Sequence, residues 1–170
     1  PVTVDPLMSP TVDRNAIQDT HIIAGNPNAN YDVNNHIRIR NDGYAMLKFP
    51  TPSLSSGDKI VNAQLILAPY GAYDTSNIKY SNANSFNPPL YITAHKILRS
   101  WEETTATYNN INPQNGFYDN TVESCAVVDG DGHYYNWDIT KLMNEWTEGY
   151  SGNYGVLLKY AALPSDGSVF

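Results

Sequence analysis

Short segments of alternating apolar and polar residues run along most of the chain. A period of two is typical of strands that bury one face against a core. Asn, Gly, Pro and Ser gather between these segments, as they do in turns. The pattern predicts strands at residues 17–23, 35–40, 44–49, 60–68, 90–98, 122–128, 134–137 and 155–160.

Some details of this pattern predict strand pairing and facing. Residues 35–40 and 44–49 are separated by Asn41-Asp42-Gly43, a sequence that favours a tight hairpin turn, so we expect these two strands to pair. Residues 104–108 also alternate and predict an edge strand. In the strand at 60–68, one face carries Val61, Ala63, Leu65 and Leu67, and the other carries Ile60, Asn62, Gln64 and Ile66.

One segment follows the period of a helix. Its apolar residues recur at i, i+3, i+4 and i+7, namely Ile139, Leu142, Met143 and Trp146. This single stripe predicts one short helix, residues 139–148, that caps the core. Asp138 stands where an N-cap carboxylate accepts backbone N–H groups, and Gly149 suits the left-handed position after the last turn. Many short strands with one short helix predict an all-β fold, a jelly-roll β-sandwich.

Composition and charge disfavour several classes of protein. The chain has 170 residues, which is enough for one domain with its own core. The formal net charge is −7 and the 10 Lys and Arg residues are scattered, which disfavours a duplex nucleic-acid binder. No apolar run approaches the ~20 residues that span a bilayer. Cys125 is the single cysteine, and its apolar neighbours favour a small core side chain over a reactive thiol.

The sequence carries no recognisable catalytic motif. It has no Gly-x-Ser-x-Gly, His-Glu-x-x-His, P-loop or paired Cys-x-x-Cys pattern, and its four His residues are far apart. Glu102 and Glu103 adjoin Trp101, but they make a poor glycosidase pair because adjacent residues of a strand point to opposite faces. We therefore predict a module without enzymatic activity.

The segment Asp129-Gly130-Asp131-Gly132 resembles the start of a calcium loop. Alternate Asp side chains between glycines can direct their oxygens at one hard cation. No bidentate Glu follows at the EF-hand position, so a plain β-turn is the favoured interpretation. Asp129 and Asp131 are the candidate ligands of a structural calcium ion, and no other cofactor is indicated.

Tyrosine is the residue type that most changes the functional picture. The chain has 13 Tyr but only 4 Phe. Aromatic rings have flat apolar faces and polar edges, which suit the apolar C–H faces of sugars. The long Asn-, Ser- and Tyr-rich segment between Pro69 and Pro89 predicts a functional loop. The candidate carbohydrate-binding residues are Tyr70, Tyr73, Tyr80 and Tyr134. The alternative is that such tyrosines only cover the core and keep their hydroxyl groups in water.

A series of motifs occurs in an order typical of one family. The series comprises Asp19-Thr20, residues 45–49 leading to Leu54, residues 60–65, 101–110, 137–140 with Trp146, and 153–158. Over nearly its whole length the chain resembles the DNRLRE domain family, a group of bacterial and archaeal extracellular modules related to carbohydrate-binding modules. Residues 1–6 are similar to the segment that precedes this domain in large wall-associated proteins with RHS/YD repeats. Tyr108 departs from the family pattern, which often has Trp there.

The resemblance implies a jelly-roll β-sandwich, an extracellular or cell-surface location and no catalysis by this module. It also implies glycan binding or surface attachment within a larger secreted or wall-associated protein. The expected partners are a polysaccharide or cell-wall glycan and the remainder of the parent polypeptide. The alternative function is a structural or adhesive spacer of a surface or toxin-delivery protein, without a sugar ligand. We expect Trp101 and Trp146 to hold the core.

The ends of the chain carry separate predictions. We expect an extended lead-in or linker at residues 1–16 and a single β-sandwich domain at 17–170. Residues 163–168 predict a turn, and Val169 and Phe170 begin a β-prone segment that stops at once. The domain is therefore predicted to lack its last strand, which would leave an open edge. Strand addition by a neighbouring chain at that C-terminal edge is the matching partner prediction.

Overall fold

The computed structural model describes residues 17–34, 36–68, 89–129 and 134–161. The strands in these ranges are β1 (Gln18–Ile23), β2 (Gly43–Lys48), β3 (Gln64–Leu67), β4 (Leu90–Lys96), β5 (Ser124–Val128), β6 (Tyr135–Asp138) and β7 (Val156–Ala161), and the helices are α1 (Tyr108–Ile111) and α2 (Thr140–Thr147). The predicted lead-in at 1–16 and the predicted open edge after residue 161 fall outside the described residues, so they stay predictions. Within the described ranges, no helix is long and apolar enough to cross a membrane.

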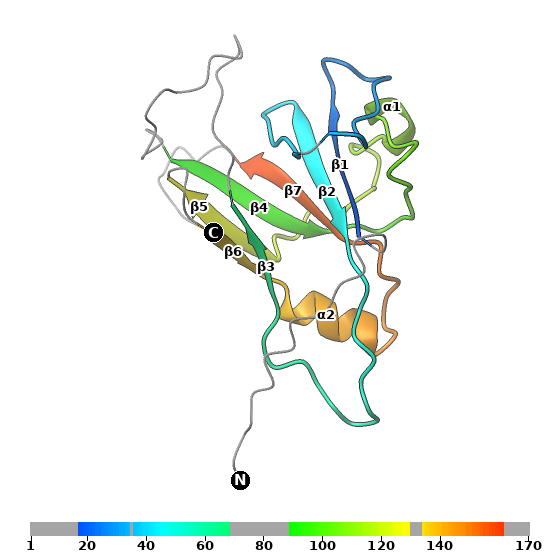
Figure 1. The fold of residues 1–170 in the computed structure, drawn as a ribbon, viewed down its shortest axis with the longest axis vertical. Coiled ribbons are helices and arrows are strands. Elements are labelled where there is room, and N and C mark those ends of the chain that lie inside the picture. Colours follow the sequence, from blue (N-terminus) through cyan, green and yellow to red (C-terminus); the bar gives the residue numbers. More distant parts are fainter. Residues whose placement is uncertain (1–16, 35, 69–88, 130–133, 162–170) are drawn as a thin grey trace.

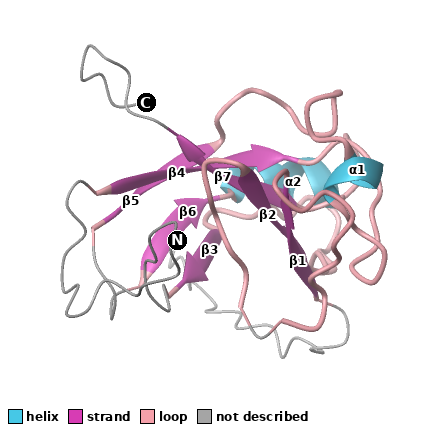
Figure 2. Ribbon diagram, turned by 90° about the horizontal axis from the view of Figure 1, so that it is seen from above, coloured by secondary structure: helices cyan, strands magenta, loops and turns pink. Residues whose placement is uncertain are grey.

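The strands form two antiparallel sheets that lie one over the other (Figures 1 and 2). One sheet has five strands in the order β1-β2-β7-β4-β5, and the other consists of β3 and β6. Helix α2 lies beside the β3–β6 sheet and completes this second layer. The predicted all-β sandwich is confirmed.

The main core lies between the two layers. The five-stranded sheet contributes alternate residues of its strands, among them Ala45, Leu47, Ile92, Ala94, Val156 and Leu158. The second layer contributes Trp137, Ile139, Leu142, Met143 and Trp146. Trp137 also donates a hydrogen bond from Nε1 to the carbonyl oxygen of Ile92 at 2.8 Å. This bond joins the layers within an otherwise apolar interior.

The outer face of the five-stranded sheet is buried as well. Ile22, Met46 and Leu157 point to this side, where the chain between β4 and β5 covers them. The cover contributes Ile97, Trp101, Ala106, Ile111, Phe117 and Tyr118. The predicted core positions of Trp101 and Trp146 are therefore both confirmed, in two separate clusters.

The predicted edge strand at 104–108 is wrong, because this cover contains a turn followed by the short helix α1. Thr107 forms the N-cap. Its hydroxyl oxygen accepts a hydrogen bond from the N–H of Asn110, and the Asn110 side chain accepts one from the N–H of Thr107. This reciprocal capping box satisfies backbone donors that a strand would have presented to a neighbour.

Helix α2 is held by its apolar stripe and by two polar side chains. The predicted stripe is confirmed, since Leu142, Met143 and Trp146 are buried. On another side of the helix, Asn144 bonds to both backbone groups of Ile60, accepting from its N–H at 3.0 Å and donating to its oxygen at 2.8 Å. Thr140 Oγ1 accepts from the N–H of Ala63 at 2.9 Å. The helix therefore pairs with residues 60–63 much as a neighbouring strand would.

The boundaries of this region differ from the prediction. The strand predicted at 60–68 begins only at Gln64, because α2 binds the backbone of the preceding residues. Val61 is 80% exposed and does not share the inward face of Leu65 and Leu67. The N-cap of α2 is Ile139 rather than Asp138, whose Oδ1 nevertheless accepts a hydrogen bond from the N–H of Thr140.

The predicted hairpin between 35–40 and 44–49 is also wrong. The turn exists, since the N–H of Gly43 donates to the oxygen of Arg40, but the pairing stops at that isolated bridge. Strand β2 pairs instead with β1 on one side and β7 on the other. Ile37 and Ile39 pack against the main core from irregular chain. The alternation of apolar and polar residues here reflects which side chains are buried, and no ladder of strand hydrogen bonds accompanies it.

His21 is the most unusual polar residue of the core. It is 0% exposed, its ring stacks on Tyr31 at 4.2 Å between centroids, and neither ring nitrogen has a hydrogen-bond partner among the described residues. Burial, with the nearby charges of Arg38, His36 and Arg40, lowers the pKa of His21 to about 4. Its neutral form is the one that the fold accepts.

We expect Trp146→Ala to lower the free energy of unfolding by about 3–5 kcal/mol, the usual cost of truncating a buried aromatic side chain. Trp146 is buried and its ring packs against Phe49 at 6.1 Å between centroids. Tyr150→Ala is the matched control, because Tyr150 is 78% exposed just beyond the helix. Urea unfolding followed by circular dichroism measures both, and a loss below 1 kcal/mol for Trp146→Ala would contradict the assignment.

We expect the free energy of unfolding to decrease as the pH falls from about 6.5 to 4. Over this range His21 takes up a proton in the unfolded chain but stays neutral while it is buried in the folded chain. The contribution is at most about 1.4 kcal/mol per pH unit. His21→Phe keeps a ring on Tyr31 and removes the titration, so its unfolding free energy should vary less over this range. Burial also lowers the pKa of His95, so some slope should remain. An unchanged slope in the variant would show that His21 is not responsible.

Candidate functional site

One face of the β3–β6 sheet points away from the core. Along β3 the exposed positions are Gln64 and Ile66, and the register sets them opposite Asp138 and Asn136 of β6. Tyr134, directly before β6, is 77% exposed and two residues from Asn136. We call Gln64, Ile66, Tyr134, Asn136 and Asp138 the β6 row.

The β6 row combines the groups that sugar recognition needs. Tyr134 offers an exposed aromatic ring, and Ile66 adds apolar surface. Gln64 and Asn136 supply amides that both donate and accept hydrogen bonds, while Asp138 accepts only. At about 3.3 Å per residue, the row extends roughly 13 Å along the strand. A chain-like ligand would therefore meet several of these side chains at once.

At the Asp138 end, the β6 row meets a pocket of about 350 Å³ beside the start of α2. Ile139 and Leu142, both buried, supply its apolar side. Asp138, Thr140 and Asn144 contribute polar atoms. Apolar walls with a few fixed polar groups are typical of ligand pockets.

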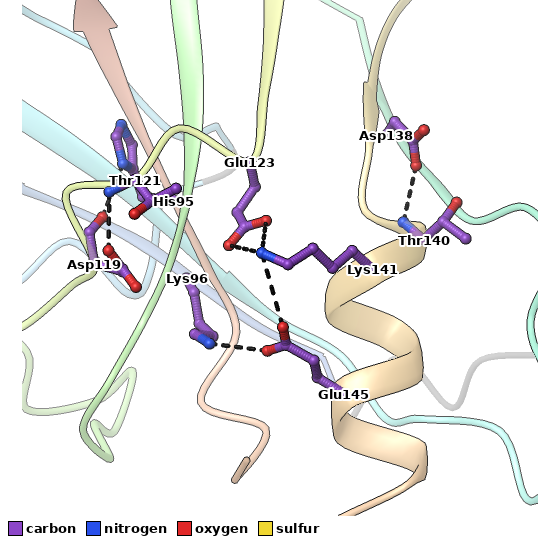
Figure 3. Close-up of polar contacts among 9 residues, drawn as sticks. All are labelled: His95, Lys96, Asp119, Thr121, Glu123, Asp138, Thr140, Lys141 and Glu145. Carbon is purple, nitrogen blue, oxygen red and sulfur yellow. Dashed lines mark hydrogen bonds and ion pairs between the residues drawn. The ribbon is translucent and has the colours of Figure 1, made fainter. Parts of the chain in front are cut away.

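The rim of this pocket is fixed by ion pairs (Figure 3). Lys141 Nζ lies 2.9 and 3.1 Å from the two carboxylate oxygens of Glu123 and 3.8 Å from Glu145. Glu145 in turn accepts a hydrogen bond from Lys96 at 2.8 Å. The hydrogen bonding by Glu123 raises the pKa of Lys141. These contacts link α2 to β4 and to the residue that precedes β5.

Asp138 stays charged beside the pocket. Hydrogen bonding by the Thr140 side chain and backbone holds the pKa of Asp138 below its usual value, and the Thr140 N–H lies 2.9 Å from Oδ1. The carboxylate is exposed, so its remaining acceptor positions face solvent. It can accept hydrogen bonds from hydroxyl groups of a bound molecule.

His95 and Asp119, also drawn in Figure 3, have a structural role. His95 is 2% exposed, and its ring nitrogens lie 2.9 Å from the Asp119 carbonyl oxygen and 3.0 Å from Thr93 Oγ1. Asp119 Oδ1 accepts from the N–H of Thr121 at 2.9 Å, and this bond lowers the pKa of Asp119. His95 is therefore a hydrogen-bonded residue of strand β4.

The other predicted site residues are only partly described. Tyr70, Tyr73, Tyr80 and Asp131 lie outside the described residues. Asp129 Oδ1 accepts a hydrogen bond from the hydroxyl of Tyr135 at 2.6 Å, so one of its oxygens already has a partner. In the ranges that the structure covers, no three His, Cys, Asp or Glu side chains gather as metal ligands would. The calcium site stays a prediction.

Two further expectations need correction. Glu103 lies in a turn and Glu102 directly precedes it. Neither residue is on a strand, so the predicted alternation of their faces does not apply. Glu102 is exposed, whereas Glu103 is half-buried, and burial with the nearby charge of Asp19 raises the pKa of Glu103. Cys125 is only half-buried and is not a core side chain, although burial does raise the pKa of its thiol.

Sequence reasoning identified one member of the β6 row as a binding candidate and missed the rest. The spacing Tyr134-x-Asn136-x-Asp138 was the available signal, because alternate strand residues share a face. Gln64 and Ile66 join the row only through the pairing of β3 with β6, which the sequence does not specify.

Comparison with known protein families gives a match over most of the chain. A search of the curated proteins finds no match. The sequence model of carbohydrate-binding module family 96 matches residues 10–165, which include every described strand and helix. The chain belongs to carbohydrate-binding module family 96.

Proposed function

We propose that this chain is a non-catalytic module that binds a glycan along the β6 row and into the pocket beside α2. The observation that carries the proposal is the family match together with Tyr134, an exposed ring at one end of a row of hydrogen-bonding groups. A pyranose ring stacked on Tyr134 would direct the next units towards Asn136 and Asp138. The ion pairs of Lys141 and the hydrogen bond from Thr140 to Asp138 fix the pocket end of the site before a ligand arrives, which lowers the entropic cost of binding.

The biological setting follows from the same proposal. The module would attach a larger secreted or wall-associated protein of a bacterium or archaeon to an extracellular polysaccharide. Its resemblance to the DNRLRE domain family supports this setting. A spacer without a sugar ligand is the competing function, and it predicts no glycan binding by the folded domain.

We expect Tyr134→Ala to weaken glycan binding about tenfold or more, as for an interface aromatic that carries much of the binding energy. Tyr150→Ala is the matched control, because Tyr150 is equally exposed but follows α2 instead of preceding β6. An array of soluble plant and bacterial wall polysaccharides identifies the ligand, and affinity electrophoresis then measures both variants. If the folded wild-type chain binds no glycan on the array, the spacer function replaces this proposal. Equal binding by Tyr134→Ala would move the site away from β6.

The loop tyrosines can be tested in parallel. If the segment between Pro69 and Pro89 also contacts the glycan, the double variant Tyr73→Ala/Tyr80→Ala should bind more weakly at an unchanged melting temperature. The reason is that such side chains would contribute ligand contact without supporting the core. Thermal unfolding and affinity electrophoresis of the same sample measure the two effects. Full affinity in the double variant would exclude these tyrosines from the site.

A further inference from the structure

A second pocket lies on the opposite side of the five-stranded sheet. Its volume is about 270 Å³, and it lies between the chain after β4 and helix α1. Its floor consists of buried apolar side chains, namely Trp101, Ala106 and Ile111. These residues belong to the outer core cluster, whereas Leu142 of the first pocket belongs to the cluster between the sheets. The two pockets therefore lie on opposite faces of one sheet.

The rim of this second pocket is polar and exposed. It consists of Ser100, Glu102, Thr105 and Asn110. Two hydroxyls, one amide and one carboxylate provide both donors and acceptors around an apolar floor. Glu102 is the only ionisable residue of the lining. This carboxylate favours hydroxyl donors over an anionic ligand, because the neighbouring guanidinium of Arg99 is bound to the carbonyl oxygen of Ile111 at 3.2 Å.

Hydrogen bonds fix this rim in advance. The backbone oxygen of Glu102 accepts from the N–H of Ala106 at 2.9 Å, and Glu102 Oε2 accepts from the Gln18 side chain at 3.2 Å. Asn110 donates to the carbonyl oxygen of Thr105 at 2.6 Å and also closes the capping box of α1. Below them, Trp101 Nε1 donates to the carbonyl oxygen of Tyr154 at 2.8 Å, so its ring is held in one orientation.

We propose that this pocket is a second carbohydrate-binding site, which takes a single uncharged sugar at a chain end or side branch. The inference rests on the proposed function, because it assigns a sugar to a second place on the same module. The β6 row extends along a strand and suits consecutive units of a chain. The second pocket is an open hollow of about 270 Å³ with polar groups around its edge, which suits one unit. A module with both sites would bind two glycan segments on opposite faces.

The indole N–H signals of the protein provide a direct test. The chain has 3 Trp residues, and of these only Trp101 lines the second pocket. The full chain, labelled with ¹⁵N, is titrated with the methyl glycosides of glucose, galactose, mannose and xylose. We expect at least one glycoside to shift the Trp101 indole and Asn110 side-chain signals in a saturable way at millimolar concentration.

Variants separate binding from unspecific shifts. Ser100→Trp places a bulky ring on the rim and should abolish the Trp101 shift, while Thr104→Trp puts the same ring on an exposed turn residue outside the lining and should leave it unchanged. Glu102→Gln keeps the size of the side chain, loses the charge, and should weaken binding about tenfold, the usual range for a charge-assisted hydrogen bond. The Glu102→Gln result also decides the question if Ser100→Trp does not fold.

The outcomes distinguish this inference from the proposed function. Glycoside shifts confined to β6, or polysaccharide binding with no response at Trp101, would overturn the second site and leave the proposed function intact. Shifts at Trp101 that persist equally in Ser100→Trp and Glu102→Gln would also overturn it. If neither polysaccharide nor glycoside binds anywhere on the folded chain, both proposals fail. Loss of the Trp101 response in Ser100→Trp and its weakening in Glu102→Gln, with Tyr134→Ala still responding there, would establish two independent sites.

Discussion

The structure depends on a five-stranded sheet that has to be covered on both faces. In β7, Val156, Leu157 and Leu158 are consecutive and all fully buried, although neighbouring strand residues point to opposite sides. Strand β2 repeats this with Ala45, Met46 and Leu47. Exposing either set of side chains would cost roughly 1.5–3 kcal/mol for each large residue. The rest of the chain is therefore arranged as two covers.

The two covers bury the faces of the sheet with different structures. In the described residues the inner cover consists of two strands, and α2 extends it by binding the backbone of residues 60–63 through Thr140 and Asn144. The outer cover is mostly irregular and is fixed by the α1 capping box and by the indole hydrogen bond of Trp101. Both pockets lie where a helix meets irregular or edge chain. Irregular packing at such junctions leaves hollows that two flat sheets would close.

The sequence predicted the parts of the fold that depend on local pattern. The α2 stripe and the approximate positions of most strands follow from periodicity within a few residues. The pairing of the strands does not follow from periodicity. Strand β2 pairs with β1 and β7 because both of its faces are buried. Helix α1 was missed because it spans four residues and buries only Ile111, too little for a visible period.

The candidate sites also combine features that a local sequence pattern predicts with features that depend on long-range packing. The sequence predicted Tyr134 as a binding residue from its aromatic ring, although it placed this residue inside the strand instead of directly before it. The remainder of the β6 row requires the register between β3 and β6. The second pocket requires Trp101 to lie under a helix that the sequence did not indicate. Long-range packing determines both arrangements.

The strand order also has a mechanical consequence. Among the described strands, β1 lies at the edge of the sheet beside β2, whereas β7 lies between β2 and β4. A pulling force that reaches the sheet through the chain before β1 and after β7 therefore meets unequal resistance. Detaching β1 breaks one ladder of six residue pairs, and detaching β7 breaks two ladders. Under tension β1 would be released first, which would lengthen the module while the other four strands and the layer that carries the β6 row remain assembled.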